Sequence, residues 1–212
     1  MTKKARAAEA VARLATRYPD AICSLDYSSR NAFQLLVATR LSAQCTDARV
    51  NLVTPALFAR FPDAAALAAA TPEEVETYIR SCGLYKTKAR DLVAMAGQLM
   101  ERHGGEVPNT IEALTALSGV GRKTANLVCG DIFDMPGAVV ADTHCIRITN
   151  RLGLCNTKDP RKVEDQLRAL LPPDESNDFC HRLVLFGRDV CDARKPRCEA
   201  CPLADICPSK TT

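Results

Sequence analysis

The sequence predicts an all-α fold. Apolar residues recur at helical spacing along almost the whole chain, no segment alternates with the two-residue period of a strand, and several segments open with capping residues. The composition agrees, since 47% hydrophobic and 25% charged residues are ordinary for a globular protein. A chain of 212 residues can bury a substantial core and is expected to form one or two domains.

The first half of the chain divides into five expected helices. They cover residues 7–18, 31–43, 46–61, 71–83 and 86–103. The fourth has the clearest start, with Thr71 as the cap, Pro72 at the first helical position and Glu74 closing a capping box. The fifth ends at a pair of glycines, Gly104 and Gly105, which are typical helix stops.

The second half continues in the same way. The expected helices cover residues 110–117, 122–133, 142–153, 159–172 and 177–190. Asp142 and Asp159 each precede a helical pattern and are expected to cap it. A short apolar link, residues 138–141, precedes the first of these two caps.

Charge and hydropathy limit the class of protein. A net charge of +3 is compatible with a polyanionic partner but does not demand one. Glu9, Arg13 and Arg17 interrupt the N-terminal pattern, so no export signal is expected there, and no uncharged apolar run could span a bilayer. A cytoplasmic protein without a membrane partner is therefore expected.

The turn between the helices at 110–117 and 122–133 combines three useful features. Gly119 and Gly121 can adopt a positive φ and let another backbone or a phosphate approach closely. The following helix start offers N–H groups and a positive dipole end to an anion. Lys123 lies in its first turn, and a neutral lysine amine is a nucleophile. The turn therefore predicts a phosphate clamp beside a possible covalent catalyst.

The chain has eleven cysteines, and the last four form a cluster. Cys191, Cys198, Cys201 and Cys207 have the spacing C-x6-C-x2-C-x5-C, whereas the other seven are scattered and are expected to be small buried apolar side chains. A metal site is expected, because four thiols this close favour a metal over disulfides in a reducing compartment. Zinc and iron–sulfur are both possible, and the uneven spacing favours iron–sulfur.

The loop between the first two clustered cysteines carries three cations, Arg194, Lys195 and Arg197. They could simply balance the negative charge of the thiolates. They could also contact nucleic-acid phosphates, which is the interpretation we favour because the loop is short and stiffened by Pro196.

Taken in order, these motifs resemble the endonuclease III family of helix–hairpin–helix DNA glycosylases. The matching segments are 41–44 (LSAQ), 83–85 (GLY), 117–125 (LSGVGRKTA), 140–144 (VADTH), 187–188 (GR) and the four-cysteine tail. The resemblance spans about residues 8–207. It has two departures: Ser118 stands where the family usually has proline, and the stretch 136–142 is one residue longer than the usual pattern.

The resemblance implies two helical domains with a DNA-binding groove between them. A six-helix domain holding the hairpin would cover residues 25–135, and residues 1–24 with 136–212 would form a cluster domain. The family cofactor is a [4Fe–4S] cluster, for which the resemblance implies the ligands Cys191, Cys198, Cys201 and Cys207.

The resemblance also implies an activity and a set of site residues. The enzyme would remove oxidised or otherwise damaged pyrimidines from double-stranded DNA and cut the abasic strand by β-elimination, with Lys123 as the Schiff-base nucleophile and Asp142 stabilising the sugar cation. The implied DNA contacts are Gln44, Leu84, Tyr85, Gly119, Val120, Gly121, Arg122, Thr124, Arg194, Lys195 and Arg197. A monomer associated with the nucleoid is expected.

Two other functions remain open from the sequence. Monofunctional relatives excise mismatched adenine, thymine or uracil, but they typically have serine or tyrosine where this chain has Lys123. A non-catalytic helix–hairpin–helix DNA-binding protein with a structural metal would need neither Lys123 nor Asp142.

Overall fold

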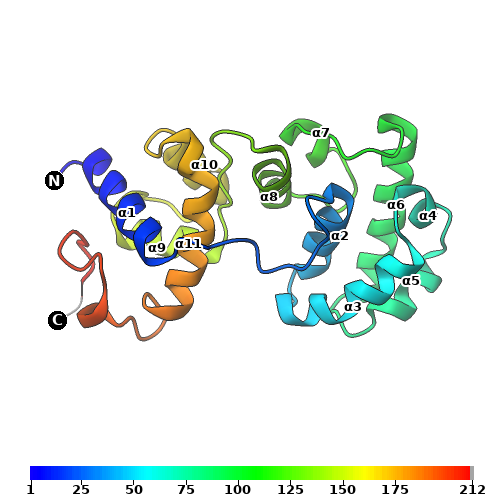
Figure 1. The fold of residues 1–212 in the computed structure, drawn as a ribbon, viewed down its shortest axis with the longest axis horizontal. Coiled ribbons are helices and arrows are strands. Elements are labelled where there is room, and N and C mark those ends of the chain that lie inside the picture. Colours follow the sequence, from blue (N-terminus) through cyan, green and yellow to red (C-terminus); the bar gives the residue numbers. More distant parts are fainter. Residues whose placement is uncertain (211–212) are drawn as a thin grey trace. The chain divides into compact units, whose positions relative to one another are not determined.

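The computed structural model describes residues 1–210 and confirms the predicted all-α fold (Figure 1). No strand occurs in that range. The helices are α1 (Lys3–Arg17), α2 (Ala32–Ser42), α3 (Asp47–Arg60), α4 (Ala64–Ala68), α5 (Pro72–Ile79), α6 (Tyr85–His103), α7 (Ile111–Thr115), α8 (Arg122–Phe133), α9 (Thr143–Arg151), α10 (Pro160–Arg168) and α11 (Ser176–Asp189). There are also two 3₁₀ turns in this range, η1 (Pro173–Glu175) just before α11 and η2 (Cys198–Ala200) after it. None of the helices within residues 1–210 is both long and apolar enough to cross a membrane.

The chain divides into two compact units. Unit 2 is the continuous segment Ser24–Phe133, which contains α2 to α8. Unit 1 combines Met1–Cys23 with the chain from Asp134 onward, so it contains α1 and α9 to α11. The N-terminal helix is therefore packed against residues more than a hundred positions later in the sequence.

Unit 2 is built around α2. Seven of its eleven residues are buried, namely Phe33, residues 35–39 and Leu41, and α2 packs against α3, α6 and α8. The long helix α6 packs in turn against α4 and α5, and α7 packs against α8. Because α8 starts at the predicted turn and lies against the buried α2, the turn is held on a rigid support.

Unit 1 is held together by α11, which packs against α1 and α9. Leu14, Ile148 and Phe186 come one from each of these helices and are all almost fully buried. Arg182 of α11 pairs with Glu175 over 2.8 Å and with Asp178 over 3.2 Å. The face of α9 turned toward α11 is thus fixed close to the end of the chain that carries the clustered cysteines.

Local capping chemistry explains most helix starts. The predicted caps Thr71, Asp142 and Asp159 are confirmed, since each side chain accepts a hydrogen bond from the backbone N–H three residues later. The first helix starts at Lys3 rather than residue 7, because Thr2 caps it. The short helix α4 was not expected; Asp63 caps it, but five residues are too few for a helical period to be read.

Candidate active site and cluster site

The predicted turn joins α7 to α8 in unit 2. Val120 N–H donates to the Leu117 carbonyl oxygen over 3.2 Å, and α8 begins at Arg122. Gly119 has a φ of +72°, in the left-handed region that favours glycine. A carbon added at Gly121 would meet nothing within 4 Å. A phosphate can therefore approach the first-turn N–H groups of α8 across Gly121.

The side chains of this turn differ in exposure. Gly119, Gly121 and Lys123 are exposed, Arg122 and Thr124 are half-buried, and Val120 is buried. The Val120 side chain therefore belongs to the core of unit 2, and a DNA contact at this position falls to its backbone. Lys123 is the exposed amine of the turn.

Two further segments predicted to meet DNA, at Gln44 and at Leu84, lie against each other. A carbon added at Gly83 would lie 3.6 Å from the Gln44 carbonyl oxygen, although 39 positions separate these residues in the sequence. Gln44 has a φ of +54° and Leu84 a φ of +58°, which is rare for residues with a side chain. Leu84 is 59% exposed and Gln44 is exposed, whereas Tyr85 is half-buried at the start of α6. Such held, strained positions are typical of ligand-contacting loops.

A buried lysine of α6 is hydrogen-bonded to the end of α2, close to these two segments. Lys88 is 0% exposed, and its Nζ donates to the Leu41 carbonyl oxygen at the end of α2 over 2.7 Å. Burial lowers the pKa of Lys88, since a charged amine is costly away from water. Nothing in the sequence pattern singles out Lys88, because a lysine in an amphipathic helix is ordinarily exposed.

Cys82 is buried next to Gly83 and interacts with Cys45. Burial and the hydrogen-bonded Cys45 thiol raise the pKa of Cys82 from 9.0 to about 11. We expect the alkylation rate of Cys82, followed by peptide mass spectrometry, to keep rising between pH 9 and pH 11 instead of levelling near pH 9. The free energy of unfolding should lose its Cys82 contribution over the same interval, because the unfolded thiol ionises first. A plateau in the alkylation rate near pH 9 in the folded protein would contradict this, and the urea-unfolded chain provides the control.

Asp142 caps α9 in unit 1. Its Oδ1 accepts from Cys145 N–H over 2.7 Å, and its own N–H donates to the Val140 carbonyl oxygen over 2.8 Å. The residue is half-buried, so it is partly accessible at the surface of unit 1. One carboxylate can thus be both a helix cap and an electrostatic partner.

The stretch that the sequence shows to be one residue longer forms a tied-down turn. Gly137 has a φ of +74°, its N–H donates to the Pro173 carbonyl oxygen over 2.9 Å, and its carbonyl oxygen accepts from Arg168 Nε over 2.9 Å. The following residues 138–141 are all buried. The turn is thus anchored at Gly137, ahead of the Asp142 cap.

The four clustered cysteines line one cavity of about 240 Å³ in unit 1. Leu203 N–H donates to Cys201 Sγ over 3.4 Å, and Cys207 Sγ lies 3.5 Å from the Arg151 carbonyl oxygen. Burial and the charge of neighbouring cysteines raise the pKa of Cys201 and of Cys207. Bare thiols here would stay protonated, whereas bound metal ions stabilise thiolates. Four thiols around one cavity are the donor set that an iron–sulfur cluster takes, although within residues 1–210 no three His, Cys, Asp or Glu side chains are grouped to hold a single metal ion.

Helix α9 holds the first cysteine of this cavity. Arg151 Nη1 donates to Cys191 Sγ over 3.3 Å and to the Asp192 carbonyl oxygen over 2.7 Å. Arg147 Nη2 donates to the Cys191 carbonyl oxygen over 3.1 Å. The helix that Asp142 caps therefore also fixes the start of the cysteine segment.

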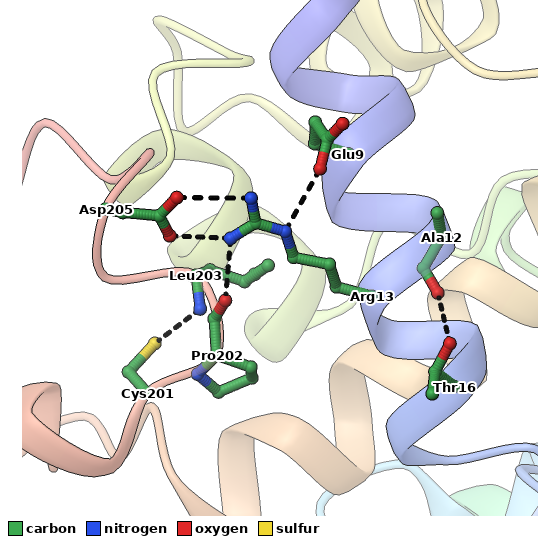
Figure 2. Close-up of polar contacts among 8 residues, drawn as sticks. All are labelled: Glu9, Ala12, Arg13, Thr16, Cys201, Pro202, Leu203 and Asp205. Carbon is green, nitrogen blue, oxygen red and sulfur yellow. Dashed lines mark hydrogen bonds and ion pairs between the residues drawn. The ribbon is translucent and has the colours of Figure 1, made fainter.

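Helix α1 holds the other end of the segment, as Figure 2 shows. Arg13 forms a two-pronged pair with Asp205, at 2.6 and 3.1 Å, and also donates to the Pro202 carbonyl oxygen over 3.0 Å. Glu9 accepts from Arg13 Nε over 3.1 Å and orients the guanidinium. The hydrogen bond from Arg13 keeps the pKa of Asp205 below its ordinary value.

The basic loop between Cys191 and Cys198 is folded by Asp192. Its Oδ1 accepts from the N–H groups of Arg194 and Lys195 over 2.8 and 3.0 Å, and these bonds lower the pKa of Asp192. Arg194 and Lys195 are exposed. Arg197 pairs with Asp189 over 2.7 Å, so it contributes less free charge to this loop than the sequence suggests.

Comparison with known proteins places these features in a family. Residues 37–173 match the model of the HhH-GPD superfamily base excision DNA repair proteins, and residues 191–207 match the iron–sulfur binding domain of endonuclease III. Endonuclease III of Synechocystis sp. is 47% identical over 98% of this chain and 94% of its own length. Endonuclease III of Escherichia coli K12 is 41% identical over 98% of this chain and 97% of its own length.

A solved structure of a trapped covalent endonuclease III–DNA intermediate superposes with a TM-score of 0.92 at 41% identity. The superposition covers 99% of this chain and 98% of the other. The superfamily model covers more than half of the chain and includes both the glycine turn and Asp142, while the iron–sulfur model spans the four cysteines. This chain belongs to the endonuclease III family of the HhH-GPD superfamily of base-excision DNA repair proteins.

Proposed function

We propose that this chain is a bifunctional base-excision enzyme: a DNA glycosylase that removes oxidised or damaged pyrimidines from double-stranded DNA, and a lyase that cuts at the resulting abasic site. The observation that carries the proposal is the exposed Lys123 in the first turn of α8, immediately after the open Gly121. It is supported by the family to which the chain belongs and by a relative that has been trapped covalently on DNA.

In this mechanism the damaged nucleotide leaves the stack before the chemistry begins. The backbone of Gly119 to Thr124 binds a phosphate of the damaged strand. The side chains of Gln44, Leu84 and Tyr85 fill the space that the nucleotide vacates. The exposure of Leu84 and the left-handed backbone at Gln44 and Leu84 support this assignment.

Lys123 and Asp142 then carry the covalent steps. The neutral Lys123 amine attacks C1′ of the sugar, and the glycosidic bond breaks with its electron pair leaving on the base, which takes up a proton. Asp142 stays ionised while it stabilises the positive charge that develops on the sugar, and it assists the proton transfers of the reaction. The attached amine then loses a proton, and its lone pair breaks the C1′–O4′ bond to form a protonated imine, while O4′ takes up a proton. The protonated imine acidifies C2′, so loss of a C2′ proton expels the 3′ phosphate and cuts the strand.

The cofactor is a [4Fe–4S] cluster, which we assign to Cys191, Cys198, Cys201 and Cys207. These four thiolates would hold the cluster, which would cross-link the segment after α11 to Cys207. Arg194 and Lys195, exposed on the loop between the first two ligands, would then meet DNA phosphates. We propose that unit 2 acts as the hairpin domain and unit 1 as the cluster domain.

The partner is DNA, and we further propose that the enzyme acts as a monomer on duplexes holding a damaged pyrimidine or an abasic site. A soluble location in the cytoplasm, at the nucleoid, follows from this substrate. Arg194 and Lys195 on the basic loop between Cys191 and Cys198, together with the net charge of +3, support attraction to the phosphate backbone.

Borohydride reduction during turnover tests the proposed function. The wild-type protein should form a stable adduct with duplex DNA containing thymine glycol or an abasic site, and Lys123→Gln should form none. Lys162→Gln is the matched control, because Lys162 is an exposed lysine in the first turn of α10 in unit 1. Base release without an adduct would instead indicate a monofunctional glycosylase. Binding without base release or an adduct would indicate a non-catalytic DNA-binding protein.

A further inference from the structure

The turn that contains Gly119 and Gly121, here called the glycine turn, is hydrogen-bonded to a side chain of α6. Ser118 N–H donates to Gln98 Oε1 over 2.7 Å, across twenty positions of sequence. Both residues are half-buried. The bond therefore ties the first residue of the turn to a long, well-packed helix, and it needs an N–H group that a proline at position 118 would lack.

A second polar contact from the same face of α6 supports the next residue. Asp91 lies seven positions before Gln98, two helical turns along the same face. It pairs with Arg40 of α2, whose Nε lies 3.1 Å from Asp91 Oδ2. A carbon added at Gly119 would be 2.5 Å from Arg40 Nε and 3.0 Å from Asp91 Cβ, so this ion pair lies directly against the turn.

These contacts leave the turn little freedom to shift as a body. Arg40 and Asp91 limit how close Gly119 can approach α6, while Gln98 prevents Ser118 from moving away. The backbone from Ser118 to Lys123 is short, so a shift of Ser118 also shifts the phosphate-binding N–H groups and Lys123. Small displacements of a reacting group carry a large cost in rate.

We propose that Gln98 is a positioning residue for the DNA-binding turn. Its amide oxygen replaces, through a hydrogen bond to Ser118 N–H, the stiffness that a proline at position 118 would give to the backbone. The inference rests on the proposed function, since it concerns the turn that presents Lys123. It implies that Gln98 matters only while residue 118 retains an N–H group.

The test is a double-mutant cycle on a reduced abasic duplex, which the protein binds but cannot cleave. Gln98→Leu removes the acceptor and leaves Ser118 N–H without its partner, so we expect the Kd to rise about tenfold. Ser118→Pro removes the donor. The double variant Gln98→Leu/Ser118→Pro should bind within about twofold of Ser118→Pro alone, because neither partner is then left unpaired.

Gln166→Leu is the matched control. Gln166 Oε1 also accepts from a backbone N–H, that of Asn156 over 3.2 Å, but in unit 1. It should lower thermal stability by a similar amount and leave the Kd unchanged. The single-turnover rate at saturating enzyme should also fall for Gln98→Leu and recover in the double variant, which a loss of folded protein alone would not produce.

Two outcomes would overturn the role of Gln98: a Gln98→Leu protein that binds like wild type, or a double variant that binds as weakly as Gln98→Leu. Failure of the proposed function has a different signature, because the wild-type protein would then give no borohydride adduct. The binding cycle uses an uncleavable duplex, so its result does not depend on that chemistry.

Discussion

Asp142→Asn is expected to slow base excision by about 10²–10⁴-fold while unit 1 keeps its thermal stability. Asparagine caps a helix as well as aspartate does, so the hydrogen bond from Cys145 N–H should persist and the free energy of unfolding should change by less than about 0.5 kcal/mol. What the variant loses is the negative charge. Single-turnover kinetics on a thymine glycol duplex, beside a thermal unfolding scan, measure both effects.

Asp159→Asn separates the charge from the cap. Asp159 caps α10 in the same unit, and its Oδ1 accepts from Lys162 N–H over 2.9 Å, but no catalytic role is proposed for it. This variant should match the wild type in both stability and rate. If Asp142→Asn also excised the base at the wild-type rate, Asp142 would be a helix cap and no more.

Helix starts are the part of this fold that the sequence predicts best, because a cap depends on residues within one turn. Thr71, Asp142 and Asp159 each bond the N–H three residues later, as their spacing predicts. The boundaries fail where the local signal is short or unusual. Thr2 extends α1 toward the N-terminus, and α4 contains only five residues.

The supports of the site could not be predicted, because each joins residues that are distant in the sequence. Arg40 lies against Gly119, Lys88 bonds the Leu41 carbonyl oxygen, and Arg13 grips Asp205 from 192 positions away. The sequence does identify the cysteines, whose spacing is local. It cannot show which arginines of α9 and α1 fix the loop, since an arginine on an amphipathic helix has the same pattern whether it binds solvent or a carbonyl oxygen.

The sequence also does not predict the backbone conformation of the site residues. Gln44 and Leu84 have left-handed backbones without being glycine, and their two segments lie against each other although they are distant in the sequence. The opposite holds at Gly121, which does not have a positive φ. Gly121 matters because the space around it is open. A sequence motif does not distinguish a glycine that leaves open space from one that is needed for a positive φ.

Close packing around Gly187 couples the stability of unit 1 to its cluster. A carbon added there would lie 2.3 Å from His144 Nδ1 and 2.7 Å from Arg147 Nη2, so these two side chains of α9 would have to move away from α11. We expect Gly187→Ala to lower the free energy of unfolding by about 2 kcal/mol, equivalent to roughly 4–8 °C in Tm. Arg147 also bonds the Cys191 carbonyl oxygen, so the visible absorbance of the cluster should decay faster with a chelator present.

Gly97→Ala is the control for the direction of this change in the free energy of unfolding. Gly97 lies inside α6 in unit 2, and a carbon added there would meet nothing within 4 Å. Alanine should therefore stabilise the helix by about 0.5–1 kcal/mol and leave the cluster unaffected. The two variants add the same methyl group to a helix interior, so the difference between them isolates the contact of α11 with α9. Equal Tm values for Gly187→Ala and wild type would show that His144 and Arg147 can move aside without cost, and the coupling between this contact and the cysteine segment would then be wrong.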